Sequence, residues 1–320
     1  MKNMCRNLII IIVIVLITML FLWSCDDEIK VTVAPIATSN SSSFAIKDDS
    51  LWAWVSNEHG RLGDGTTEDR HSPVHIMDDV VAVSSSFLHA MAIQSDGSLW
   101  AWGRSLHGRL GDGTTEDRHS PVHIMNDVVA VSAGFTHTVA IQSDGSLLAW
   151  GSNFAGQLGD GTTERRYIPI KIIDDVSDIA TGFLYTVAIK SDGSLWAWGE
   201  NQHGQLGDGT TDNRHSPVHI IDDVIAVSAG REHTMAIRSD GSLWAWGRNG
   251  AGRLGDDTGV NRYKPIRIMD DVVATSAGWD HTLTIRNDGS LWTWGSNRHG
   301  QLGDGTNDWR QSPVTIVLDE

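Results

Sequence analysis

The chain has 320 residues, of which 40% are hydrophobic, and its formal net charge is −16 at pH 7. An acidic surface repels phosphate, which argues against nucleic acid and anionic lipid as partners of the folded part. Cys5 and Cys25 are the only cysteines, so disulfides and cysteine-ligated metals are excluded from the rest of the chain.

Residues 1–25 have the composition of a targeting segment. Lys2 and Arg6 form a short basic region, and an apolar run from Leu8 to Trp23 follows. This run is short for a membrane-spanning helix, which needs about 20 residues, but it suits the apolar part of a signal peptide. It ends in Leu22-Trp23-Ser24-Cys25, which resembles the lipobox of bacterial lipoproteins.

The lipobox resemblance implies that Cys25 is lipidated and becomes the first residue of the mature protein. A plain N-terminal membrane anchor is the alternative. Either way, the rest of the chain is expected outside the cytoplasm, tethered to a membrane of the cell envelope, on the periplasmic side or at the cell surface. Residues 26–32 then form an acidic and polar tether.

From residue 33 onward the sequence is built from a repeat of 48 residues. The period is carried by one tryptophan position, Trp54, Trp102, Trp150, Trp198, Trp246 and Trp294, and by glycine and proline positions that keep the same step. A fixed period in this range indicates a solenoid, a propeller or an array. Because the period is unbroken, we expect residues 33–320 to form one domain of six repeats.

One repeat contains four short strands and one long loop. The expected strands are residues 73–76, 80–84, 89–93 and 99–103, with a tight Asp-Gly hairpin at 95–98 and a glycine-rich loop over 104–119. In the last strand, Trp100 and Trp102 share one face while Leu99 and Ala101 share the other. Both faces are apolar, which favours a propeller blade packed between two neighbours. The sequence therefore predicts an all-β, six-bladed propeller.

The ends of the repeat region predict how the ring closes. After its tryptophan strand (291–295) and proline strand (313–316), the last repeat has no counterpart of residues 80–84. The segment Val33 to Ala37 matches that missing strand. We therefore expect Val33 to Ala37 to complete the last blade and close the propeller.

The repeat resembles that of the regulator of chromosome condensation family. The residues that carry this resemblance are Gly-Gln-Leu-Gly-Asp-Gly (156–161), Ala-Gly-x-x-His-Thr-x-Ala-Ile (133–141) and the recurring Asp-Gly-Ser-Leu-Trp-Ala-Trp-Gly. The resemblance implies a β-propeller, commonly of seven blades, whereas this chain counts six repeats. The founding member is a guanine-nucleotide exchange factor, and bacterial relatives include secreted binding proteins. Function lives in sites and not in folds, so these activities do not follow from the repeat alone.

Two polar sets recur with the period, and both have a structural interpretation. One repeat position holds His89, His137, Tyr185, His233 and His281. We expect these side chains to bond the backbone of a neighbouring blade rather than a metal. The glycine-rich loops carry an aspartate and, six residues later, an arginine in every copy, as in Asp64 and Arg70. We expect them to pair within the loops rather than bind calcium.

The residues that differ between copies are the better candidates for function. Just before the histidine strand, the copies carry Phe87, Phe135, Phe183, Arg231 and Trp279. Propeller symmetry places them on one rim, and aromatic residues and arginine are the usual hot spots of protein interfaces. Neutral drift between repeats is the alternative interpretation.

These observations predict an exported, membrane-tethered scaffold for protein–protein interaction. The sequence offers no single catalytic set, no metal site and no cofactor motif, so we expect no enzyme. A propeller hydrolase or lyase with a site at the axial end face is the alternative. Exchange-factor activity comes third, because the acidic charge and the exported N-terminus both argue against it.

Overall fold

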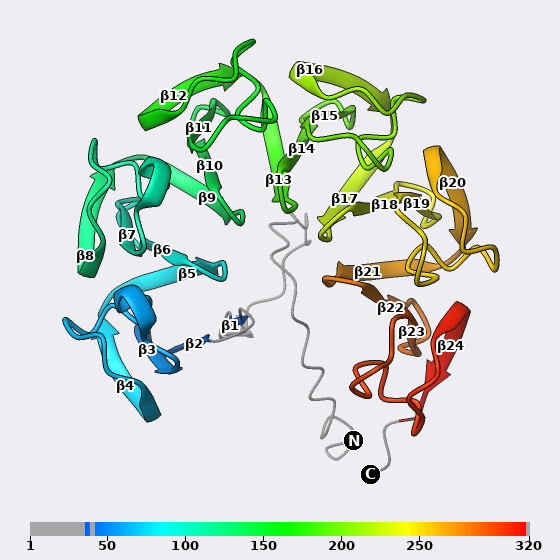
Figure 1. Cartoon of the computed structure of the whole chain (residues 1–320), viewed down its shortest axis with the longest axis horizontal. Helices are drawn as coiled ribbons and strands as arrows, with labels where there is room; N and C mark the ends of the chain where they lie inside the picture. The colour runs from blue at the N-terminus through cyan, green and yellow to red at the C-terminus, as the bar shows by residue number, and fades with distance from the viewer. Residues whose placement is uncertain (1–35, 39–41, 318–320) are drawn as a thin grey trace, which may run out of the picture.

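The computed structural model describes residues 36–38 and 42–317. These residues form six sheets, each of four antiparallel strands, arranged around a common centre (Figure 1). We call the sheets blades 1 to 6 in chain order. The prediction of an all-β propeller with six four-stranded blades is confirmed.

The elements of the described residues are as follows. Blades 1 and 2 comprise β1 (Ile36–Thr38), β2 (Ser42–Lys47), β3 (Ser50–Val55) and β4 (Arg70–Met77), then β5 (Val80–Ser85), β6 (His89–Gln94), β7 (Leu99–Gly103) and β8 (Arg118–Met125). Blades 3 and 4 comprise β9 (Val128–Ala133), β10 (His137–Gln142), β11 (Leu147–Gly151) and β12 (Arg166–Ile173), then β13 (Val176–Thr181), β14 (Tyr185–Lys190), β15 (Leu195–Gly199) and β16 (Arg214–Ile221). Blades 5 and 6 comprise β17 (Val224–Ala229), β18 (His233–Arg238), β19 (Leu243–Gly247) and β20 (Arg262–Met269), then β21 (Val272–Ala277), β22 (His281–Arg286), β23 (Leu291–Gly295) and β24 (Arg310–Ile316). Two short 3-10 helices, η1 (Glu58–Gly60) and η2 (Leu106–Gly108), lie in the long loops of blades 1 and 2.

Within each blade the chain runs from the centre to the periphery. In blade 2, β5 lies nearest the centre and β8 lies outermost (Figure 1). The first five residues of β6 are all buried, because this middle strand is covered by a neighbouring blade on each side. The outer strand carries Pro121, which suits an edge strand because proline has no N–H for a further ladder.

A buried tryptophan joins each of blades 2 to 6 to the blade before it. Trp102 of β7 is fully buried and lies over Gly63, in the long loop of blade 1. A Cβ built on Gly63 would stand 2.8 Å from the indole Nε1, and Gly63 has a φ of +85°. Only glycine allows both this conformation and this approach. Burying each indole removes about 150–250 Å² from water, so these contacts dominate the packing between blades.

The predicted closure of the ring is wrong. Val33 to Ala37 was expected to join the sheet of Leu291–Gly295, but β1 pairs with β2 of blade 1, with Ile36 opposite Ala45. Blade 6 has its own innermost strand, β21. Each proline strand belongs to the blade of the tryptophan strand before it, so the last repeat lacks no strand.

The outer strands also begin earlier than expected. The sequence placed the start of the strand at the proline, but β8 begins at Arg118. Arg118 lies opposite Gly103 beyond an irregularity in the register between β7 and β8. The three polar residues before Pro121 are therefore part of the strand, and the first of them pairs with β7.

The two ends of the strands differ in the length of the connections that they carry. Because His89 lies opposite Gly103 and Ile93 lies opposite Leu99, the loops before β6 and after β7 share one end, which we call the loop end. The short turns between β6 and β7 and between β8 and β9 lie at the other end, the turn end. Every turn of the turn end carries at least one aspartate, as Asp96 and Asp127 do in blade 2.

The segment predicted to direct export lies outside the described residues. This applies to Cys25 and to the apolar run before it. Within 36–38 and 42–317, no helix is long and apolar enough to span a membrane.

Candidate partner-binding surface

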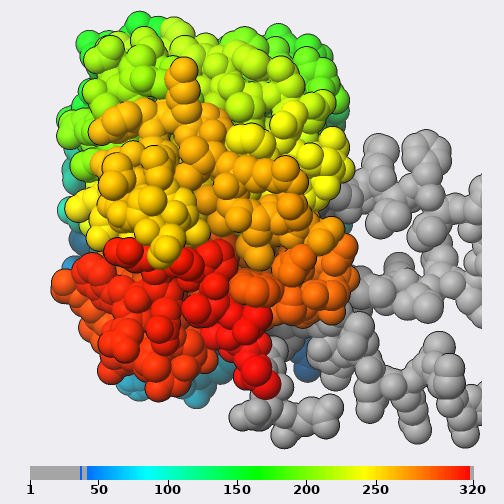
Figure 2. Space-filling model, turned by 90° about the vertical axis from the view of Figure 1, so that its right-hand side faces the viewer, coloured from blue at the N-terminus to red at the C-terminus, as the bar shows by residue number. Residues whose placement is uncertain are grey.

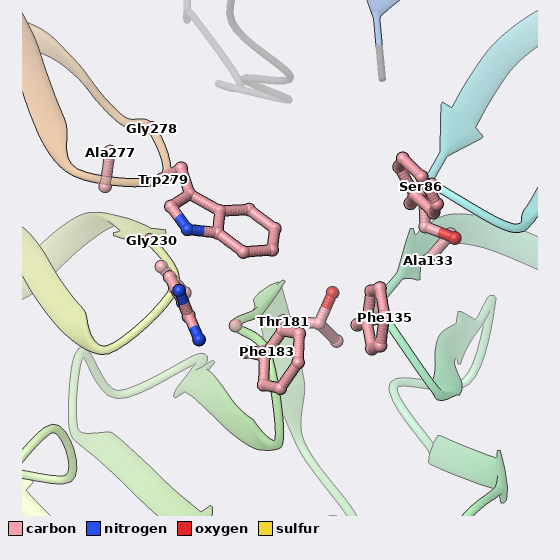
Figure 3. A pocket seen from close by; sticks show the side chains of 14 residues that line it. Ser86, Ala133, Phe135, Thr181, Phe183, Gly230, Ala277, Gly278 and Trp279 are labelled. Atoms are coloured by element: carbon pink, nitrogen blue, oxygen red, sulfur yellow. The ribbon is translucent and has the colours of Figure 1, made fainter. Parts of the chain in front are cut away.

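The five residues that vary before the histidine strands meet at the loop end. Phe87, Phe135, Phe183, Arg231 and Trp279 each come from the loop between the first and second strands of blades 2 to 6. Together they line one open hollow near the centre of the ring (Figure 3). We call these five residues the aromatic rim.

Ring contacts join the members of the aromatic rim. Phe135 stacks on Phe183 with ring centroids 4.3 Å apart, and Phe87 lies 6.3 Å from Phe135. Phe183 meets Trp279 edge to face at 5.7 Å. The guanidinium carbon of Arg231 lies 5.3 Å from the Phe183 ring centre and 4.7 Å from that of Trp279. The rim is thus one continuous apolar surface with a cation held between two rings.

The aromatic rim is open to solvent. Phe87 is 39% exposed and Trp279 is 38% exposed, while Phe135, Phe183 and Arg231 are half-buried. Residues buried between blades would serve packing, as Trp102 does, but these side chains keep ring surface outside the blades. The structure therefore brings the five predicted residues together on one face, and their role as a binding surface stays a prediction.

Buried arginines hold the aromatic rim in place. Arg109 is almost fully buried, and its Nη1 donates to the carbonyl oxygen of Phe135 at 3.2 Å. Arg253 is also buried, and its Nη1 lies 2.7 Å from Oδ1 of Asp280, the residue after Trp279. Burial lowers the pKa of Arg109 to about 10, so it remains charged at neutral pH. These arginines fix the loops that carry the rim.

These arginines are not among the site residues that the sequence predicts. They occupy a repeat position that holds either arginine or glutamine. The residues at this position are, in order, Arg61, Arg109, Gln157, Gln205, Arg253 and Gln301. This restriction to two residue types is visible in the sequence. The role of the arginines is not visible there, because the contact from Arg109 to Phe135 joins blades 2 and 3.

A second hollow adjoins the aromatic rim at Trp279. It lies between the loops of blades 5 and 6, has a volume of about 630 Å³, and includes Arg248, Arg253 and Arg298 among its lining residues. Arg298 stacks over Trp309 at 5.1 Å, whose side chain is 43% exposed. Two of the three arginines in this hollow are already in ion pairs, Arg248 with Glu232 and Arg253 with Asp280.

The recurring histidines are structural, but their partner differs from the expected one. His89 Nε2 lies 2.8 Å from the hydroxyl of Thr138 in the next blade, and His137 is placed in the same way against Thr186. The hydroxyl of Thr138 in turn donates to the carbonyl oxygen of Arg109, so His89 must donate through Nε2. Only Tyr185 bonds the neighbouring backbone directly, at the carbonyl oxygen of His233 (2.6 Å). Burial lowers the pKa of His137 to about 3, which keeps it neutral.

The aspartates of the glycine-rich loops pair with arginine in every copy, as predicted. In blade 3, Arg166 Nε donates to Asp160 Oδ2 at 2.7 Å, while Asn153 Nδ2 and Thr162 donate to Oδ1. Burial raises the pKa of Asp160, but the bonds from Thr162 and Arg166 outweigh it and lower the pKa overall. The carboxylate is thus occupied by its own loop. Within the described residues, no three side chains of histidine, cysteine, aspartate or glutamate gather as a metal site.

Comparisons with known proteins agree with the geometry. Residues 23–320 match a family model described as the RCC1-like domain. The solved structure of human WBSCR16 is 21% identical, with a TM-score of 0.79 over 88% of this chain and 81% of that one. Prp20p from Saccharomyces cerevisiae is 22% identical, with a TM-score of 0.78 over 89% of this chain and 76% of that one. The CRINKLY WD40 ectodomain of the Arabidopsis thaliana receptor kinase ACR4 is 13% identical, with a TM-score of 0.51 over 89% and 82% of the two chains. No curated protein matches the sequence.

Proposed function

Because this chain belongs to the RCC1-like domain family, we propose that it is a scaffold that binds another protein through the aromatic rim. The single observation that carries the proposal is the continuous, solvent-exposed contact of three phenylalanines, one tryptophan and one arginine across five blades. Such residues supply large contact area at low cost in side-chain entropy. A scaffold of rigid blades presents them in a fixed arrangement.

Charge around the rim indicates the kind of partner. Arg298 lines the hollow beside Trp279 and stacks over Trp309, whereas Arg248 and Arg253 of the same hollow already pair with Glu232 and Asp280. A partner with an acidic side chain next to apolar ones fits Arg298 and the aromatic rim beside it.

Solved relatives support binding of proteins in general terms. The structure of Prp20p is described with its binding properties to Gsp1p and histones, and another structure shows Kap60 bound to it. At 22% identity these likenesses bear on the fold and do not transfer a partner. An exchange-factor role for this chain rests on family resemblance alone.

The proposal includes a place in the cell and an absence of catalysis. The lipobox-like sequence before Cys25 supports a tether to a membrane of the cell envelope, outside the cytoplasm. The hollow at the rim is lined by aromatic rings, small residues and a single cation, which suits recognition better than a hydrolase or lyase reaction.

The experiment is a pull-down with the soluble segment from Asp26 onward as bait. Trp279→Ala and Arg231→Ala should each weaken the captured complex by more than about 1 kcal/mol, the usual mark of a significant contact. Ile168→Ala is the matched control, because Ile168 is 58% exposed on β12, at the outer edge of blade 3. If the rim variants retain a partner as well as the control does, the rim is not the binding surface.

A further inference from the structure

The contacts between consecutive blades repeat one arrangement of a glycine and a tryptophan. In the first and the last blade, one of these two residues lacks its partner among the described residues. In each contact one blade offers a glycine and an apolar face, and the next blade inserts a tryptophan. The filled pairs are Gly63 with Trp102, Gly111 with Trp150, Gly159 with Trp198, Gly207 with Trp246, and Gly255 with Trp294. Blade 6 retains the glycine half at Gly303, and blade 1 retains the tryptophan half at Trp54.

Gly303 and Trp54 have no such partner among the described residues. A Cβ built on Gly303 would meet only Ile316 Cγ2, at 4.0 Å, whereas its equivalents would meet an indole nitrogen at 2.6–2.8 Å. Trp54 is partly exposed, whereas its five equivalents are fully buried. Among the described residues, nothing fills the site for an indole on blade 6 or covers the face of the indole on blade 1.

The apolar face of blade 6 is uncovered as well. Leu283, Ile285 and Leu291 are partly exposed. Their counterparts in blade 2, Met91, Ile93 and Leu99, are buried against blade 3. Figure 1 shows blades 1 and 6 at the two ends of the arc, with no described strand between β4 and β24, and Figure 2 shows the flank formed by blades 5 and 6.

Within the described ranges, the hydrogen bonds between blades also lack a partner at the first and the last blade. In three of the five filled interfaces a histidine bonds a threonine hydroxyl of the next blade, as His137 does with Thr186. His281 of blade 6 has no such hydroxyl near it in the described part of the chain. Ser43 lies opposite Trp54, as Thr186 lies opposite Trp198. Ser43 thus occupies the threonine position of blade 1, and its side-chain hydroxyl bonds none of the described residues.

We propose that the opening between blade 6 and blade 1 is a docking slot for one blade-type β-sheet of a partner protein. The slot continues an interface that the chain builds five times, so its two walls specify what enters. On the side of blade 6, the slot binds an indole ring of the partner over Gly303 and a hydroxyl group of the partner beside His281. The wall of blade 1 takes a glycine under Trp54. This inference is independent of the aromatic rim.

A second copy of this chain does not fit as a rigid body. Its blade 1 is followed directly by its blade 2, and a contact of the same geometry would put that blade 2 where blade 1 of the first copy already lies. The occupant is therefore a single sheet with free space beyond it.

The test uses a seventh repeat as the probe. Residues 224–271 are duplicated in tandem within the full chain, which moves the last blade one position further around the ring. The readout is the solvent exposure of Trp54, measured by fluorine NMR with fluorotryptophan and solvent quenching, with Trp54→Phe to assign its signal. In the six-repeat chain we expect Trp54 to be quenched, and in the seven-repeat chain we expect this quenching to fall several-fold.

Gly303→Ala in the seven-repeat chain should restore the quenching of Trp54. Gly305→Ala is the matched control, because its φ is +76° and nothing lies within 4 Å of its Cβ position. Three results overturn the proposal. The first is a seven-repeat chain that fails to fold or leaves Trp54 exposed, and the second is a six-repeat monomer that already protects Trp54. The third is protection in the six-repeat chain that grows with protein concentration, which would make a second copy the occupant.

Discussion

Replacing Gly159 with alanine tests whether the glycine-to-indole contact holds the blades together. Gly159 has a φ of +81°, and a Cβ at this position would stand 2.7 Å from Nε1 of Trp198. Trp198 is fully buried and cannot move away without disturbing the strands on both sides. The matched variant is Gly303→Ala, where φ is +70° but no indole is present.

The expected loss of stability has two parts. Holding alanine at positive φ costs about 1–2 kcal/mol, and this part applies to both variants. Forcing a methyl group into a packed contact costs about 1–3 kcal/mol more, and this part applies only at Gly159. We therefore expect Gly159→Ala to lower the free energy of unfolding by about 2–5 kcal/mol and Gly303→Ala by about 1–2 kcal/mol.

Urea denaturation followed by circular dichroism measures both losses. Near-ultraviolet circular dichroism adds a local signal, because the surroundings of Trp198 change only in the first variant. Equal losses in the two variants would refute the reasoning, since the backbone cost alone would then explain both.

Three further predictions concern the histidines, the loops and the export signal. The contribution of the buried histidines to the free energy of unfolding should be fully present above pH 6.5 and should fall as the pH drops towards 4.5. Burial lowers the pKa of His137 to about 3 and also lowers those of His89 and His233, so in this window these histidines take up protons only in the unfolded chain. Urea midpoints measured across the window should vary less with pH in His137→Gln than in the native protein, and an unchanged pH dependence would contradict the assignment. Asp160→Asn should lower the free energy of unfolding by about 1–3 kcal/mol, because it disrupts hydrogen bonds to a charged group, whereas Glu164→Gln in the same loop should change this free energy little. Added calcium should leave the urea midpoint of the native protein unchanged. A rise of that midpoint that saturates at a stoichiometric amount of calcium would favour a calcium site instead. Cys25→Ser should release or mislocalise the protein, and a variant that fractionates and labels with fatty acid like the native protein would leave residues 8–23 as a plain anchor.

The sequence predicted the repeat and its strands well because each repeat is a local pattern. Trp100 and Trp102 on one face, with Leu99 and Ala101 on the other, required a blade covered on both sides. The pattern could not say where a blade begins, because a periodic sequence has no intrinsic starting point. The turn at Asp78 and Asp79 looks like a hairpin within a sheet, but it leads from the outer strand of one blade to the inner strand of the next. That ambiguity produced the wrong closure.

The candidate site was partly predictable for the same reason. Phe87, Phe135 and Phe183 share a repeat position, and symmetry alone brings such positions to one face. Arg109 escaped notice because its importance lies in a contact with another blade. The histidines were assigned the right kind of role and the wrong acceptor, because the hydroxyl that His89 meets lies 49 residues further along the chain.

The pairing of β1 with its own blade makes this molecule a row of separate cooperative units. No described strand is exchanged between the first and last blades, so each blade is held by its own ladder and by contacts with its immediate neighbours. In such a linear array the stability is close to a sum of unit terms and nearest-neighbour terms. Blades 1 and 6 each have one neighbour where the others have two, so opening should proceed inward from the ends like a fraying helix. Amide exchange should then be fastest in β2 and β22 and slowest in β10 and β14, giving a gradient along the chain.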